Sequence, residues 1–73
     1  MLFKLNQAKL DGKIVEKGMT KEGLAREIGV DRSTFFRRIR SNTLRLKDIH
    51  AICQVLGLTN DEAIEIFLAK QSQ

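Results

Sequence analysis

The sequence has no proline, no tryptophan and no tyrosine, and it contains one cysteine, Cys53, and one histidine, His50. A single cysteine cannot form a disulfide within the chain, which fits a reducing compartment. No apolar run approaches the roughly 20 residues that span a bilayer, and the first residues are too short an apolar stretch for the core of a signal peptide. These absences predict a cytoplasmic protein that does not enter a membrane, organised as one domain over residues 1–73.

The shortage of reactive side chains also argues against catalysis. His50 and Cys53 stand three residues apart, but a structural zinc site needs four ligands and the sequence offers no second pair. There is no glycine-rich phosphate loop and no carboxylate pair enclosed by apolar sequence. We therefore expect no enzymatic activity, no cofactor and no metal. Cys53 is interpreted as a small core residue and His50 as a residue on a helix surface.

Apolar residues recur at helical spacing in five segments, which start near residues 6, 20, 31, 46 and 59. Asn6, Thr20, Asp31 and Thr59 are good N-caps, and Thr59 with Glu62 forms a capping-box pattern. No alternating run appears beyond the first five residues, so the sequence predicts an all-α fold. The residues expected in its core are Leu10, Ile14, Leu24, Ala25, Ile28, Phe35, Ile39, Leu46, Ile49, Ile52, Cys53, Leu56, Ala63, Ile64 and Phe67, with Val15 at the edge.

The stretch from Thr20 to Arg40 predicts two short helices joined by a tight turn. Gly29 ends the first helix, since glycine enters the positive-φ conformation without steric cost. Asp31 can cap the second helix and suits its positive end. Phe35 and Ile39 then stand four residues apart, so the second helix also has an apolar face. Two such helices form a helix-turn-helix, whose second helix lies in the DNA major groove.

This stretch resembles the Cro/C1-type (lambda-repressor-like) DNA-binding domains. The similarity implies a compact five-helix lambda-repressor-like domain with its helix-turn-helix at about residues 20–40. The family usually has an apolar residue at the position of Arg38, whereas here the apolar residue comes next, at Ile39. The residues that carry the resemblance are Leu24-Ala25, Ile28-Gly29-Val30, Asp31-Arg32-Ser33-Thr34, Phe35, and Leu46 through Leu58.

Charge is concentrated on and after the expected recognition helix. The net charge is +4, and the stretch from residue 32 to residue 47 holds six basic residues and no acidic one. A basic centre of this kind is typical of a nucleic-acid binder; for any one cation the alternative is a solvent-facing charge. The residues predicted to read bases are Arg32, Ser33, Thr34 and Arg37. The residues predicted to contact phosphates are Thr20, Lys21, Arg38, Arg40, Arg45 and Lys47.

The two ends of the chain leave alternatives open. Residues 1–5 are interpreted as an apolar arm folded over the core, the alternative being a short strand that pairs with a second subunit, and residues 70–73 are expected to fray. Ile66 and Leu68 do not share a face with the expected core residues of the last helix. Together with Phe3 they are candidates for a protein interface, although a lone exposed apolar residue needs no explanation.

Two functional hypotheses follow. The first is a sequence-specific transcriptional regulator, similar to Cro-like repressors of phages or prophages, that binds double-stranded DNA as a homodimer on a two-fold-symmetric operator. The second is a small modulator that binds a phage repressor protein and alters its DNA binding. Salt separates the two hypotheses, because affinity that depends on phosphate contacts falls steeply as salt rises.

Overall fold

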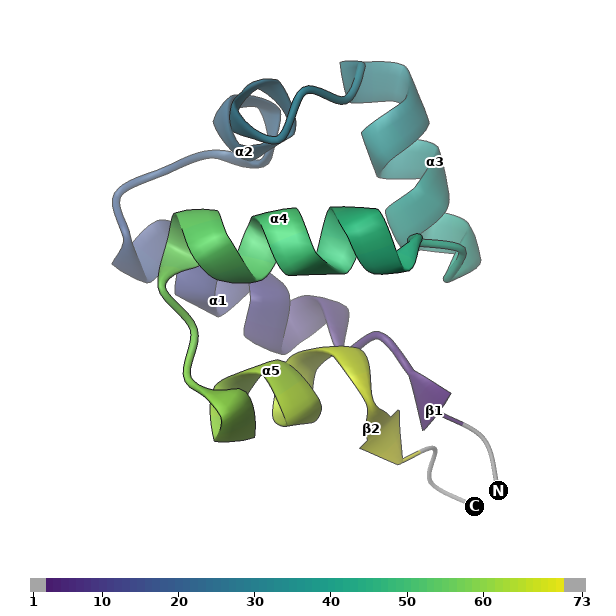
Figure 1. Cartoon of the computed structure of the whole chain (residues 1–73). Helices are drawn as coiled ribbons and strands as arrows, with labels where there is room; N and C mark the ends of the chain where they lie inside the picture. The colour runs from purple at the N-terminus through teal and green to yellow at the C-terminus, as the bar shows by residue number, and fades with distance from the viewer. Residues whose placement is uncertain (1–2, 71–73) are drawn as a thin grey trace.

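The computed structural model describes residues 3–70 and contains five helices and two very short strands (Figure 1). The chain is therefore a compact five-helix domain, as the sequence predicted. Within residues 3–70, no helix combines the length and the apolarity that crossing a membrane requires. The elements are β1 (Phe3–Lys4), α1 (Gln7–Glu16), α2 (Lys21–Glu27), α3 (Arg32–Ser41), α4 (Leu46–Leu56), α5 (Asn60–Phe67) and β2 (Ala69–Lys70).

Four of the helices begin at the caps that the sequence predicted. A side-chain oxygen of the cap residue accepts a backbone N–H from the first helical turn in each case. These bonds satisfy amide groups that have no partner within the helix. The caps are Asn6, Thr20, Asp31 and Thr59.

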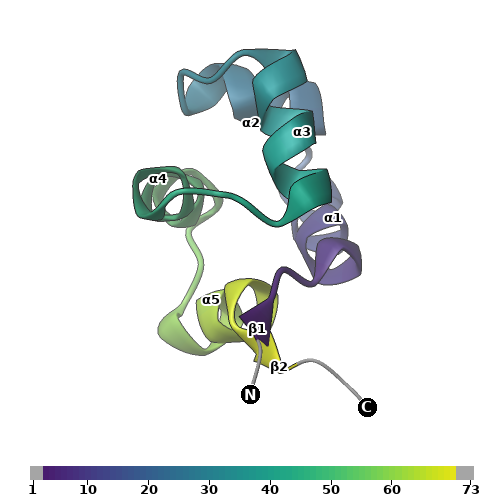
Figure 2. The same ribbon diagram turned by 90° about the vertical axis from the view of Figure 1, so that its right-hand side faces the viewer.

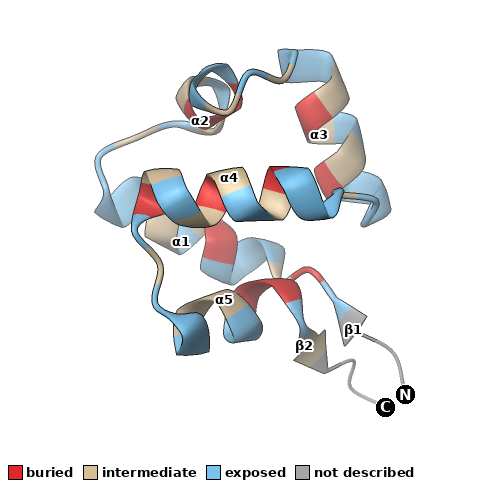
Figure 3. Cartoon of the chain, viewed as in Figure 1, coloured by how far each residue is buried: buried red, intermediate tan, exposed pale blue. Residues whose placement is uncertain are grey.

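The core lies between the helices, and every helix contributes buried residues to it (Figure 3). Phe35 and Ile39 are buried at the predicted spacing on α3. In Figure 1, α4 runs across the middle of the molecule, with α2 and α3 above it and α5 below. The buried apolar residues are Leu5, Leu10, Ile14, Leu24, Ala25, Phe35, Ile39, Ile52, Leu56, Ile66 and Phe67.

Some core predictions were wrong because the face of the helix that turns toward the core contains other residues than the predicted ones. The buried positions of α4 are Asp48, Ile52 and Leu56, so Leu46, two residues before Asp48, projects from the opposite side and is 84% exposed. Val15, which was expected at the edge of the core, is 72% exposed.

The inward face of α5 also differs from the prediction. Ile66 and Phe67 are buried, and Ala63 packs beside them, whereas Ile64 is exposed. The backbone carbonyl of Ile66 also accepts the N–H of Asn6 at 2.7 Å. The end of α5 is thereby held against the start of α1, and Ile66 lies in the core. Its assignment to a protein interface was wrong, since its side chain is only 2% exposed.

The two ends of the described chain pair with each other. Phe3 lies opposite Lys70, and Lys4 opposite Ala69, in an antiparallel ladder. The short strand is thus paired within this chain rather than with a second subunit. The backbone N–H of Leu5 donates to Asn42 Oδ1 at 3.0 Å, which links the N-terminal segment to the residue after α3. Of the segments assigned to the arm and the tail, residues 1–2 and 71–73 lie outside the described residues.

An ion pair joins α1 to α5. Lys13 Nζ donates to Glu62 Oε2 at 2.6 Å, and Thr59 donates its backbone N–H to the other carboxylate oxygen. These hydrogen bonds, that of Lys13 first, stabilise the ionised carboxylate and lower the pKa of Glu62 to about 2. The hydrogen bond to Glu62 in turn raises the pKa of Lys13.

Candidate nucleic-acid interface

The turn between α2 and α3 is built from local signals. Gly29 has a φ of +76°, and the N–H of Val30 then donates to the carbonyl of Ala25 at 2.9 Å. Asp31 Oδ2 accepts the N–H of Ser33 at 3.0 Å and starts α3. The chain therefore turns within a few residues and places α3 crosswise to α2, as a helix-turn-helix requires (Figure 1).

α3 forms one side of the described molecule and faces the viewer in Figure 2. Its buried residues, Phe35 and Ile39, hold it against the core. Ser33, Arg37 and Arg40 follow one another at helical spacing on the exposed side. Helical periodicity thus gives the helix one apolar face toward the core and one basic face toward solvent.

The four predicted base-reading residues are all near the outer surface of α3. Arg32, Ser33 and Arg37 are exposed, and Thr34 is half-buried beside them. Arg37 takes part in none of the ion pairs found within residues 3–70. Its guanidinium is therefore available for an acceptor on another molecule.

Arg38 has a structural role that the sequence did not predict. Its Nη1 donates to Asp48 Oδ2 at 3.0 Å, and its side chain is only 17% exposed. The same oxygen of Asp48 accepts the N–H of Arg45 at 3.1 Å, at the start of α4. The structure corrects the assignment of Arg38 to a phosphate, because its guanidinium is committed to joining α3 to α4.

Asp48 is the functional partner that sequence reasoning missed. It is 3% exposed and has two hydrogen bonds to one oxygen. A signal was present in the sequence, since Asp48 is the first acidic residue after the basic stretch. The ion pair also accounts for an arginine at a position where the resemblance predicts an apolar side chain, because it ties α3 to α4 by charge, in addition to the apolar packing of Phe35 and Ile39.

Two further cations of the interface are paired. Lys21 Nζ lies 3.1 Å from Asp11 Oδ1, and Arg32 Nε lies 2.7 Å from Glu22 Oε2. Both cations also lie near the ring of Phe36, with distances to the ring centroid of 5.8 Å for Lys21 Nζ and 5.1 Å for Arg32 Cζ. Phe36 therefore has a role in the basic surface as a ring that attracts cations.

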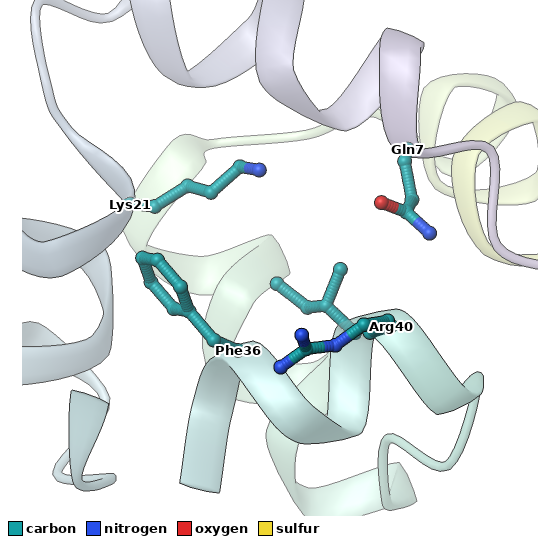
Figure 4. A pocket seen from close by; sticks show the side chains of 5 residues that line it. Gln7, Lys21, Phe36 and Arg40 are labelled. Atoms are coloured by element: carbon teal, nitrogen blue, oxygen red, sulfur yellow. The ribbon is translucent and has the colours of Figure 1, made fainter. Parts of the chain in front are cut away.

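A hollow lies beside Phe36, between the N-terminal ends of α1 and α2 and the C-terminal half of α3. Figure 4 shows the amide of Gln7, the ammonium of Lys21 and the guanidinium of Arg40 around it. Amide and cationic donors of this kind suit a phosphate group. Like Arg37, the predicted phosphate ligands Arg40, Arg45 and Lys47 are absent from the ion pairs within residues 3–70. Thr20, the residue before Lys21, is exposed, and its hydroxyl oxygen accepts the N–H of Gly23 at 3.0 Å.

The remaining candidates lie away from this surface. Leu68 is 52% exposed at the end of α5, while the side chain of Phe3 lies outside the described part. His50 is exposed, and burial raises the pKa of the half-buried Cys53. Within residues 3–70 no cluster of histidine, cysteine or acidic side chains is placed to hold a metal ion.

Comparison with known proteins identifies the family. Residues 9–67 match the model of the Cro/C1-type HTH DNA-binding domain. Comparisons with curated proteins and with solved structures gave no match. The matched segment covers most of the chain and contains both α2 and α3. The chain therefore belongs to the family of Cro/C1-type helix-turn-helix DNA-binding domains, which bind DNA and are not enzymes.

Proposed function

We propose that this protein is a sequence-specific transcriptional regulator of the Cro-like type, encoded by a phage or prophage, that occupies an operator and blocks transcription. The observation that carries the proposal is the outer face of α3. Ser33, Arg37 and Arg40 are exposed there in one line, and Arg32 lies at the start of the same helix. A helix placed in the major groove presents residues of its first two turns to base edges.

The chemistry of the side chains assigns some of them to base edges and others to phosphates. Arginine makes two parallel hydrogen bonds to N7 and O6 of guanine, so Arg32 and Arg37 are the proposed readers of guanine. The hydroxyl groups of Ser33 and Thr34 can each donate or accept one hydrogen bond, and more than one type of base offers a matching group. The proposed phosphate contacts, which set position and orientation, are Thr20, Lys21, Arg40, Arg45 and Lys47.

The proposed active form is a homodimer on a two-fold-symmetric site. One α3 spans 10 residues and reads only a short stretch of DNA. Two copies related by a two-fold axis place their helices in successive major grooves, about one helical turn apart. The exposed Ile64 on α5 and Leu68 directly after it offer apolar surface for such an association.

Selection from a random pool of duplex DNA at two salt concentrations tests this proposal. We expect enrichment of a two-fold-symmetric site and an affinity that falls steeply with salt. Arg32→Ala with Arg37→Ala should abolish the preference for that site while circular dichroism shows an intact fold. Lys9→Ala with Lys17→Ala removes the same charge from exposed positions on and just after α1 and serves as the control. A double arginine variant that still discriminates as well as this control would refute the assignment.

A second candidate function is the modulator that binds a phage repressor protein. Two apolar side chains, Ile64 on α5 and Leu68 directly after it, favour this function, since each is 52% exposed. An interface built on them would resist salt, unlike phosphate contacts. A purified protein that enriches no DNA site but binds a repressor with little dependence on salt would favour this function over the first.

A further inference from the structure

An acidic residue of α2 forms an ion pair with one of the proposed base-reading residues. Glu22, in the first turn of α2, holds Arg32, the first residue of α3, through a contact of 2.7 Å between Oε2 and Nε. The side chains are 64% exposed for Arg32 and 55% for Glu22. A pair this exposed contributes little to the free energy of unfolding. Its main effect is on the position of the Arg32 guanidinium.

The contact leaves a defined part of Arg32 free. A guanidinium has five N–H groups in a rigid, planar fork. Glu22 engages the Nε edge, so the two Nη groups remain available at the end of the side chain. The ring of Phe36, 5.1 Å from Arg32 Cζ, lies beside the same guanidinium and restricts it further. Two groups from different helices, the carboxylate of Glu22 and the ring of Phe36, thus restrict the guanidinium of Arg32.

We propose that Glu22 is a positioning residue that orients Arg32 to read one guanine with its two Nη groups. The inference rests on the proposed function, since it assigns a role within sequence-specific DNA binding. Guanine presents N7 and O6 as a pair of acceptors in the major groove, which matches a fork of two donors. Orientation before binding reduces the rotamer freedom that the arginine loses on contact. Glu22 thereby favours guanine at one base pair even though its own charge repels DNA.

Three variants separate orientation from charge. Glu22→Ala removes both the acceptor and the charge, while Glu22→Gln removes the charge and keeps an acceptor oxygen. Glu27→Ala removes one charge from an exposed position at the other end of α2 and is the matched control. Each variant and the wild type would be passed through the random-duplex selection, and affinities for the enriched site and for its single-base variants would be measured.

We expect Glu22→Ala to lose about threefold in discrimination at a single base pair, in keeping with the small energy of an exposed ion pair. This should be the same base pair at which Arg32→Ala loses discrimination. Glu22→Gln should retain most of the preference, and Glu27→Ala should raise affinity for all DNA without altering the preference. If Glu22→Ala and Glu27→Ala show the same base preferences, the inference is overturned and Glu22 acts only through its charge. A wild-type protein that enriches no site would overturn the proposed function as well, so the two failures are distinguishable.

Discussion

The pair between Arg38 and Asp48 predicts a large and measurable coupling between α3 and α4. Arg38→Met keeps the volume of the side chain but leaves the carboxylate of Asp48, which is 3% exposed, without its cation. Removing one partner of a buried pair costs about 3 to 5 kcal/mol. We expect about 3 kcal/mol here, because Asp48 keeps the N–H of Arg45 and Arg38 is 17% exposed.

The size of the domain decides whether this loss can be measured. A stability of about 0.05 to 0.15 kcal/mol per residue predicts a total of about 4 to 11 kcal/mol for 73 residues. The single variant should therefore be much less stable yet remain folded in much of this range. Arg38→Met with Asp48→Asn should recover stability, since the amide oxygen of asparagine still accepts the N–H of Arg45.

The assay is urea unfolding followed by circular dichroism for the wild type, both single variants and the double variant. The double-mutant cycle should give a coupling energy of about 1.5 to 3 kcal/mol, the range of hydrogen bonds to charged groups. The exposed pair of Lys9 and Glu65, at 52% and 61% exposure, is the control, and Lys9→Met with Glu65→Gln should give less than about 1 kcal/mol. Equal coupling in the two cycles would refute the claim that the ion pair seats α3.

Three further predictions concern single positions. Glu62 has a lowered pKa of about 2, so its stabilising effect is complete above its ordinary pKa and is lost as pH falls toward 2. The urea midpoints measured at pH 6 and at pH 3 should therefore differ more for the wild type than for Glu62→Gln. Equal pH dependence of the two proteins would argue against the bond to Lys13. Gly12→Ala should stabilise the protein by about 1 kcal/mol, because no heavy atom apart from the adjacent residues and the local backbone of α1 lies within 4 Å of an added Cβ. A lowered melting temperature would show that the position is crowded. Asn42→Ala should destabilise it by about 1 to 2 kcal/mol, because Asn42 has a φ of +59° and accepts the N–H of Leu5. Asn42→Gly keeps the backbone conformation and loses only the acceptor, so it should cost less than Asn42→Ala, and the reverse order would contradict this account.

The elements of the fold were predictable because their signals are local. A cap such as Asp31 or Thr20 bonds to amides two or three residues away, and Gly29 needs only its own positive φ. The spacing of Phe35 and Ile39 identifies a buried face of α3 without reference to the rest of the chain. The proposed base-reading residues also came from the sequence, because a helix-turn-helix brings residues near the start of its second helix, and about one turn later, to base edges.

The errors arose where the orientation of a helix depends on a distant neighbour. Leu46 and Ile64 are apolar and stand at helical spacing to core residues, yet both are exposed. Asp48 and Ile66 occupy buried positions instead. Asp48 meets Arg38 of α3, and the end of α5 is held against the start of α1, where the carbonyl of Ile66 accepts the N–H of Asn6. Sequence spacing does not reveal such partners, since each of them lies on, or directly before, another helix.

The sequence by itself determined five helices, the N-caps of four of them, the turn between α2 and α3, and a basic outer face on α3 opposite an apolar inner one. Each of these depends on interactions within about one helical turn, which sequence spacing specifies directly. Only the tertiary structure decided which cations are free. It paired Arg38 with Asp48 and Arg32 with Glu22 and left Arg37 without an ion-pair partner among the described residues. The physical reason is that an ion pair between two helices depends on how the helices pack, and packing is a property of the whole core.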